Sequence, residues 1–195
     1  MSLEQLAAQC AACRGCPHGA TRTQTVFAKG DPLSTLCFVG EAPGEEEDAQ
    51  GLPFVGDSGR FLDRQIAAMR EYATSIGVEF PAAPYVCNVL KCRPQGNKLL
   101  ADGADIAACS AHLWAQLRLL PNLQVIVAVG RVAAQTLLGS EEAISKLRGV
   151  PSLIGFGAVL CIPIYHPAYL LRRRNNKALH TKTWADLKLA VEGLR

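Results

Sequence analysis

The alternation of short apolar runs with longer helical segments is the feature that most restricts how this chain can fold. Four runs have the length and composition of buried β-strands: Leu36–Val39, Tyr85–Leu90, Val125–Val129 and Val159–Tyr165. Helical patterns occur between and after these runs, at about residues 58–76, 104–119, 130–147 and 179–194. Strands that alternate with helices form parallel sheets with both faces covered. The sequence therefore predicts an α/β fold in which a parallel sheet lies between helices.

Length and composition fit a single domain over residues 1–195. The chain has 195 residues, 49% of them hydrophobic, and it contains no internal repeat or long linker. That length is enough for one well-packed core. No apolar run approaches the ~20 residues of a membrane span, and the N-terminus lacks the layout of a signal peptide. We therefore expect a soluble, cytoplasmic, monomeric protein without a membrane partner.

Charge is distributed unevenly, although the net charge is only +3. Residues 41–48 contain five carboxylates, whereas residues 166–182 contain five lysines and arginines and no acid. This separation suits a polyanionic partner that binds at one rim while carboxylates act in the adjoining cleft. An ordinary mixed surface can show the same pattern by chance.

Unusual polar residues follow each predicted strand. They lie in four segments: Gly40–Asp48, Asn88–Asn97, Gly130-Arg131 and His166–Arg174. The carboxyl ends of parallel strands meet at one edge of a sheet, where open α/β folds bind their ligands. We therefore expect these four segments to form one site.

The segment after the last strand combines three kinds of residue that suit an enzyme acting on one base of DNA. His166 supplies a titratable group, residues 167–171 supply an apolar wedge, and Arg172–Arg174 supply phosphate ligands. The alternative is a helix that starts at His-Pro and continues into a solvated basic turn.

The other segments offer further candidate site residues, each with a simpler alternative. Glu41 follows the first strand and can orient a water, but the acidic run after it also suits a helix N-terminus. Phe54 lies among glycines and a proline, where it can stack on a base or pack in the core. The Asn88 amide offers a donor and an acceptor that match a uracil edge, or it can bond to backbone within the core.

Eight cysteines point to a metal or cluster site, because disulfides are rare in cytosolic proteins. Cys10, Cys13 and Cys16 form a C-x2-C-x2-C pattern near the N-terminus, and Cys92 and Cys109 lie far downstream. The other three lie in apolar strands, where free cysteine acts as a small hydrophobic residue: Cys37, Cys87 and Cys161. Five cysteines are therefore candidates for a site with four ligands.

Several motifs together resemble one known family, the family 4 uracil-DNA glycosylases of the iron–sulfur type. They are TQTVF at 23–27, GEAPGEEED at 40–48, GLPFVGDSG at 51–59, NVLKCRP at 88–94 and HPAYLLR at 166–172. The resemblance covers nearly the whole chain. It implies a three-layer α/β/α domain with a central four-stranded parallel sheet. It also implies a monofunctional enzyme of base excision repair that binds uracil-containing DNA, releases the uracil and leaves an abasic site.

The resemblance further implies a [4Fe–4S] cluster and assigns its ligands. Alignment through TQTVF places the N-terminal pair on Cys13 and Cys16, and leaves Cys10 as a spare. The other two ligands fall on Cys92 and Cys109. Four thiolates from two distant segments can also hold structural zinc, and spacing alone does not distinguish the two metals.

For an enzyme of this kind we expect the following roles for the candidate site residues, of which the match to the family's HPA motif assigns that of His166. Phe54 stacks on the flipped uracil, Asn88 reads its polar edge, and His166 donates a hydrogen bond to O2. Glu41 orients the water, with support from Glu47 and Asp48. Uracil contacts are assigned to six residues: Gly40, Ala42, Glu47, Phe54, Asn88 and His166. DNA contacts are assigned to six more, of which the first three fill the vacated stack and the others bind phosphates: Tyr169, Leu170, Leu171, Arg172, Arg173 and Arg174.

The chain departs from the family pattern between Cys92 and Cys109. Residues 93–105 lack the proline-rich pattern of the family and contain no histidine. A related branch traps uracil-DNA covalently through a histidine at this place, so that chemistry is not expected here. Two rival classes are a non-catalytic nucleic-acid-binding module and a thiol redox protein. The absence of a predicted strand before Cys13 counts against the redox protein.

Overall fold

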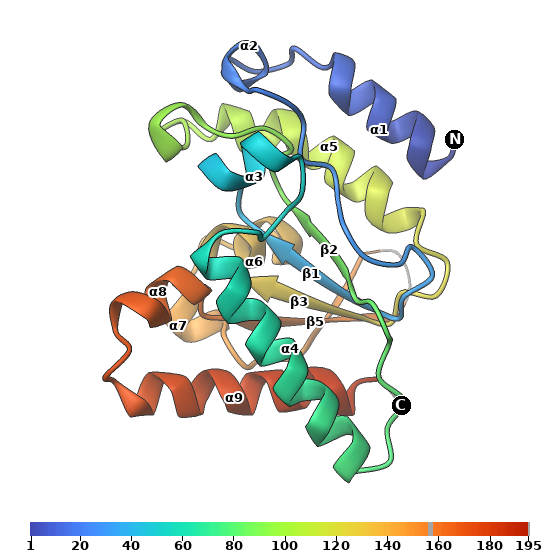
Figure 1. Ribbon diagram of the computed structural model, residues 1–195, viewed down its shortest axis with the longest axis vertical. Coiled ribbons are helices and arrows are strands. Elements are labelled where there is room, and N and C mark those ends of the chain that lie inside the picture. The colour runs from blue at the N-terminus through green and yellow to red at the C-terminus, as the bar shows by residue number, and fades with distance from the viewer. Residues whose placement is uncertain (156–157, 195) are drawn as a thin grey trace.

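A central five-stranded sheet organises the protein in the computed structural model, which describes residues 1–155 and 158–194 (Figure 1). The strand order is β2-β1-β3-β5-β4. The strands are β1 (Leu36–Gly40), β2 (Tyr85–Asn88), β3 (Val125–Val129), β4 (Ser152–Ile154) and β5 (Val159–Ile164). β1, β2, β3 and β5 are parallel, and β4 pairs antiparallel with β5. This arrangement confirms the predicted α/β class.

The predicted count of four strands is wrong by one, because it omitted β4. This strand has three residues, and the side chain of Leu153 at its centre is 70% exposed. A short edge strand carries too little of the period-two apolar pattern to be recognised in a sequence. The four predicted strands are all present, and β2 ends at Asn88, two residues earlier than expected.

Helices cover both faces of the sheet (Figure 1). One face carries α4 (Asp57–Ser75) and α9 (Lys177–Glu192), and the other carries α5 (Ala104–Arg118) and α6 (Arg131–Leu138). α1 (Leu3–Ala12) packs against α5. The remaining helical segments are short: α2 (His18–Thr21), α3 (Glu45–Gln50), the 3-10 turn Gln95–Asn97, α7 (Ile144–Leu147) and α8 (Pro167–Arg172). Among the described residues, no helix is long and apolar enough to cross a membrane.

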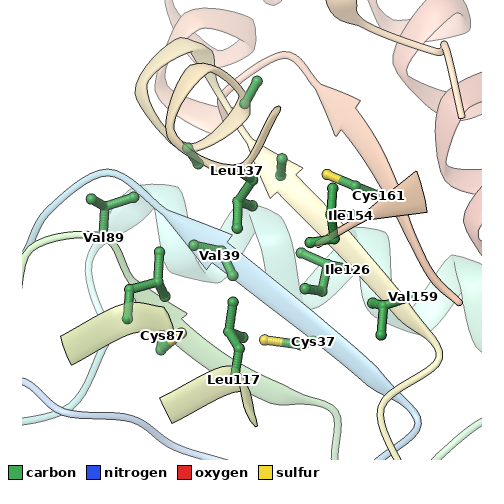
Figure 2. Close-up of a cluster of buried hydrophobic side chains, with 14 of the residues drawn as sticks. Cys37, Val39, Cys87, Val89, Leu117, Ile126, Leu137, Ile154, Val159 and Cys161 are labelled. Atoms are coloured by element: carbon green, nitrogen blue, oxygen red, sulfur yellow. The ribbon is translucent and has the colours of Figure 1, made fainter. Parts of the chain in front are cut away.

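The alternation of side chains along the strands divides the core into two clusters. Leu36 and Phe38 of β1 face the cluster that includes α4 and α9. Cys37 and Val39 face the opposite cluster, together with Ile126 and Leu117 (Figure 2). Cys37, Cys87 and Cys161 are free and buried there. This placement agrees with the expectation that these three cysteines act as small hydrophobic residues.

One predicted helix differs from the observed structure for a local reason. The segment 130–147 forms two helices, because the chain turns at Gly139, which has the left-handed φ of 61° that favours glycine. α1 ends at Ala12 and contains Cys10, whereas Cys13 follows in an extended conformation. The C-x2-C pair therefore lies in the loop that joins α1 to α2.

The parallel register brings the predicted loops to one edge of the sheet. Gly40 pairs with Asn88 at the carboxyl ends of β1 and β2, and Val129 pairs with Ile164 at those of β3 and β5. β2 and β3 lie on opposite sides of β1, so the chain changes direction across the sheet at this point. Such a switch point is where open α/β sheets form ligand crevices.

Candidate active site

A cavity opens at the carboxyl edge of the sheet, where residues from all four strand-end segments meet. Most of the predicted uracil-site residues line it: Glu41, Ala42, Glu47, Phe54, Asn88 and His166. It is also lined by Arg131, Tyr165, Tyr169 and Arg172. The four loops therefore form one site, as the strand pattern predicts.

Gly40 permits the closest packing in this site. A Cβ atom at Gly40 would lie 2.3 Å from Asn88 Oδ1 and 2.5 Å from Phe54 Cζ, which no side chain can tolerate. The absence of a side chain at Gly40 thus lets the Asn88 amide and the Phe54 ring approach the end of β1. Asn88 is 2% exposed, and no hydrogen bond to its side-chain amide is present among the described residues. That amide is available to a ligand in the cavity.

Phe54 is held in a conformation that residues with a side chain rarely adopt. Its φ is 53°. A Cβ atom at position 59 would lie 2.0 Å from the Phe54 carbonyl oxygen, so this position requires glycine. Lys29 Nζ donates to the Phe54 carbonyl at 2.9 Å. The Phe54 ring lies 6.2 Å from the His166 ring, with 28° between their planes. The ring is therefore held in place beside the imidazole, where it lines the cavity.

Glu47 braces the loop that carries Phe54. Its Oε1 accepts from the backbone N–H groups of Val55 and Gly56, both at 2.9 Å, and its Oε2 accepts from Gly44 N at 3.0 Å. Asp48 is buried and accepts from the backbone N–H groups of Thr23 and Gln24. Both carboxylates are therefore committed to backbone groups, which leaves Glu41 as the acid that the site can use.

Glu41 has no hydrogen bond to its carboxylate within the described part of the chain. Burial raises the pKa of this carboxyl group, the nearby Arg131 guanidinium opposes the increase, and Asp105 adds to it. Arg131 also lines the cavity. An unpartnered carboxylate next to a cation can accept a proton from water or stabilise a developing positive charge.

His166 is the N-cap residue of α8, and this position fixes its tautomer. The Ala168 backbone N–H donates to His166 Nδ1 at 3.1 Å, so in the neutral ring the proton lies on Nε2. Burial lowers the pKa of His166 to about 4, with a further contribution from the Arg172 cation. Gly130 makes room for the ring, because a Cβ there would lie 3.0 Å from His166 Cβ. At neutral pH the imidazole is therefore an uncharged Nε2–H donor.

The segment after His166 divides into a buried part and an exposed part. Arg172, Arg173 and Arg174 are exposed. Tyr169 lines the cavity between the Tyr165 ring, 5.3 Å away, and the Arg173 guanidinium, 4.2 Å from its centroid. Leu170 has no exposed surface. The expectation that Leu170 fills the DNA stack is therefore incorrect for this conformation, because its side chain packs into the interior, and only Tyr169 and Leu171 remain accessible.

A second cavity contains all five candidate metal-binding cysteines. It is lined by Cys10, Cys13, Cys16, Cys92 and Cys109, with Lys91, His112 and two glycines. Burial raises the pKa of Cys10 and of Cys109 to about 11 each, and in both the Lys91 cation opposes the increase. In the described ranges, no three His, Cys, Asp or Glu side chains are grouped closely enough to hold one metal ion. The five cysteines therefore line one cavity without converging on a single point.

The donor set around this cavity suits a thiolate-bound group. Three N–H groups point at the sulfurs: Gly15 N to Cys13 Sγ at 3.4 Å, Arg22 Nη1 to Cys92 Sγ at 2.8 Å, and Lys91 N to Cys109 Sγ at 3.3 Å. Hydrogen bonds to cysteine sulfur are one of the means by which proteins tune iron–sulfur centres. The cavity is therefore compatible with a thiolate-bound metal or cluster.

A buried pair joins the two segments that carry these cysteines. His18 Nε2 lies 2.8 Å from Asp105 Oδ2, and both side chains are almost fully buried. Burial raises the pKa of Asp105, but hydrogen bonds from Leu100 N, His18 and Ile106 N outweigh it and hold the pKa below its ordinary value. The pair fixes α2, which follows Cys16, to the first turn of α5, the helix that carries Cys109.

Comparison with known proteins identifies the family. A model of the uracil DNA glycosylase superfamily matches residues 27–188. The chain belongs to this superfamily. A type-4 uracil-DNA glycosylase of Thermotoga maritima is 39% identical over 169 residues, which are 85% of this chain and 81% of that protein. A type-4 enzyme of Archaeoglobus fulgidus is 37% identical over 179 residues, 88% of this chain and 84% of that one.

A type-5 uracil-DNA glycosylase of Thermus thermophilus is also similar, at 30% identity over 142 residues. That match covers 69% of this chain and 62% of the relative. Identity and coverage are both higher for the two type-4 relatives above. The resemblance seen in the motifs is thus confirmed, and this uracil-DNA glycosylase homologue groups with the type-4 proteins.

Some residues of this glycosylase-family site were not expected from the motifs. Arg131 faces the same cavity as Glu41, although only its place in an unusual strand-end loop marked it in the sequence. Arg22 and the His18–Asp105 pair support the cysteine cavity. A lone arginine or histidine in a loop has no pattern that distinguishes a site residue from a solvated one.

The His166 environment gives the first prediction. In a ¹⁵N-edited NMR titration, His166 should be neutral with its proton on Nε2 until the pH falls to about 4, because burial and Arg172 both disfavour the imidazolium. Arg172→Gln removes a cation and should therefore raise this pKa. Lys188→Gln, a charge change at a residue that does not line the cavity, should leave the pKa unchanged. A midpoint near the ordinary pKa of histidine would contradict this account.

Proposed function

We propose that this protein hydrolyses the N-glycosidic bond of deoxyuridine in DNA, releases uracil and leaves an abasic site. The observation that supports the proposal most directly is the pairing of a neutral His166 donor with the unpartnered Asn88 amide in one cavity. A base is accessible to such a cavity only after it has left the duplex. We further propose that the enzyme acts as a monomer in the cytoplasm.

Uracil recognition is assigned to the residues around the end of β1. The Asn88 amide can accept from uracil N3–H and donate to O4, which excludes cytosine because cytosine presents the opposite pattern. Phe54 provides the stacking surface. Gly40 and Ala42 let the base approach the backbone closely, and Glu47 contributes by holding the Phe54 loop in place.

The chemistry is assigned to Glu41 and His166. As the bond between C1′ and uracil N1 breaks, its electron pair moves onto the base, and negative charge develops at O2. His166 Nε2–H donates to that oxygen, and its benefit is greatest in the transition state, where the charge is largest. Glu41 stabilises the positive charge on the sugar and orients a water, whose oxygen bonds to C1′ and whose proton it accepts.

DNA binding is assigned to the segment after His166. Arg172, Arg173 and Arg174 are exposed and can contact phosphates on either side of the flipped nucleotide. Tyr169 lies beside the cavity mouth and Leu171 lies next to the arginines, so these two side chains can fill the space that the base leaves.

A [4Fe–4S] cluster is assigned to Cys13, Cys16, Cys92 and Cys109. All four thiols line one cavity, and three of them receive N–H donors. These residues would hold the cluster, which would cross-link the N-terminal loop to the loop after β2 and to α5. The chain's own residues carry out the hydrolysis in the other cavity.

The catalytic prediction concerns His166→Ser, which keeps an N-cap side chain for α8. Single-turnover release of uracil should fall ~100-fold or more, as when an oxyanion donor is removed. Binding to uracil-containing DNA should change much less, because the donor acts mainly on charge that develops in the reaction. Near-normal cleavage by the folded, iron-loaded variant would remove His166 from the mechanism. Absence of cleavage by the wild-type protein would reject the proposed function.

The DNA-contact prediction concerns the three arginines. Changing Arg172, Arg173 and Arg174 to alanine should weaken binding and reduce its dependence on salt, by a log–log slope of ~0.9 for each lost contact with duplex phosphate. Arg70→Ala, at an exposed residue of α4, is the control and should keep the wild-type slope. An unchanged slope in the triple variant would show that these arginines are only solvated.

The cluster prediction separates Cys10 from the other four cysteines. Anaerobically purified Cys10→Ser should retain the iron content and broad visible absorption of the wild type. Cys13→Ser, Cys16→Ser, Cys92→Ser and Cys109→Ser should each lose iron. Zinc without iron in the wild-type protein, or loss of the cluster on Cys10→Ser, would contradict the assignment.

A further inference from the structure

Lys91 is a buried cation that the proposed chemistry does not use. It is 1% exposed, and no carboxylate forms an ion pair with it in the part of the chain that the structure describes. Lysine is among the residues that are least often fully buried without a partner. Removing an ammonium group from water is unfavourable, even after the surroundings relax. A buried lysine without a carboxylate therefore requires another source of compensation.

Neutral acceptors satisfy its hydrogen bonds but not its charge. Lys91 Nζ donates to the Asn88 carbonyl at 2.6 Å and to Gln116 Oε1 at 2.5 Å. The Phe27 ring lies 5.8 Å from the ammonium nitrogen. The carbonyl and the amide are dipoles and the aromatic ring has a quadrupole, but none of the three carries a full negative charge.

Lys91 lines the cysteine cavity. Its backbone N–H donates to Cys109 Sγ, and Cys92 is the next residue. Four thiolates carry more negative charge than the iron–sulfide core carries positive charge, so a bound cluster is an anion. A cluster anion in this cavity would provide the compensation that the structure otherwise lacks.

Lys91 also connects the cysteine cavity to the proposed uracil site. Its Nζ binds the backbone carbonyl of Asn88, the residue whose side-chain amide faces the other cavity. Gln116, its second acceptor, donates to Tyr85 Oη at 2.8 Å and to the Phe27 carbonyl at 3.2 Å. One ammonium group thus holds the carboxyl end of β2 between the two cavities.

We infer that Lys91 is a positioning residue with two linked tasks: its ammonium is the buried counter-charge of the cluster, and it fixes the Asn88 backbone. This inference rests on the cluster assigned under the proposed function. It predicts that loss of the charge affects the cluster itself, because a cation near the cluster stabilises its more negative, reduced state. It also predicts a smaller effect on uracil recognition, through the position of Asn88.

The test compares Lys91→Met with the wild-type holoprotein. Lys91→Met keeps an apolar chain and removes the charge. Release of iron to a chelator should be about tenfold faster or more, as for loss of other groups that support metal ligands. The reduction potential of the cluster should become more negative, which a purely structural role would not cause. Lys91→Arg keeps the charge and should restore most of the potential.

Lys146→Met is the matched control, because it removes a lysine that is exposed and does not line the cysteine cavity. It should leave both the release rate and the potential unchanged. If Lys91→Met does not fold, Gln116→Glu replaces it as the test variant. A carboxylate beside the ammonium group would neutralise its charge, so iron release should again be faster and the reduction potential more negative than in the wild type.

The outcomes separate this inference from the proposed function. Wild-type protein without iron would reject the cluster assignment and the Lys91 inference with it. An iron-loaded Lys91→Met or Gln116→Glu variant with wild-type potential and release rate would overturn the inference alone. Uracil release, measured on the same samples, should show a raised KM with a smaller change in kcat, because Lys91 acts on Asn88 and does not touch the reacting atoms.

Discussion

Parallel pairing of β1 with both β2 and β3 is the constraint on which the candidate site depends. It places Gly40 beside Asn88 and brings the loops after β3 and β5 to the same edge. Because Gly40 has no side chain, Phe54 and Asn88 can converge there. The candidate catalytic groups come from different loops, but the sheet sets their spacing. The loops therefore need only local bracing, which Glu47 and Gly59 provide for Phe54.

The sequence predicted those parts of the fold that have a repeating physical pattern. Buried strands and long amphipathic helices show such a pattern, and the four predicted strands are all present. β4 was missed because three residues at an exposed edge carry almost no pattern. The burial of Leu170 was missed because a wedge and a core residue have the same composition, and only packing distinguishes them. Among the site residues, Glu41, Asn88 and His166 meet as expected, whereas the bracing role of Glu47 depends on loop geometry that no motif encodes.

The cysteine cavity depends on contacts between segments that are distant in sequence. α1 packs on α5, and the His18–Asp105 pair joins α2 to the start of α5. Hydrogen bonds to sulfur come from both segments. The protein thus brings the thiols together by ordinary packing and buried polar contacts. Spacing in the sequence could indicate which cysteines belong to the site, but it could not reveal Lys91, because a buried lysine has no signature among surface lysines.

The left-handed backbone of Phe54 has a consequence for how a base would bind. The loop is ordered before any DNA arrives, because the Gly59 backbone, Lys29 and Glu47 fix it on three sides. Under the function proposed above, a flipped base would stack on a ring that is already in place and would spend none of its binding free energy on ordering the loop.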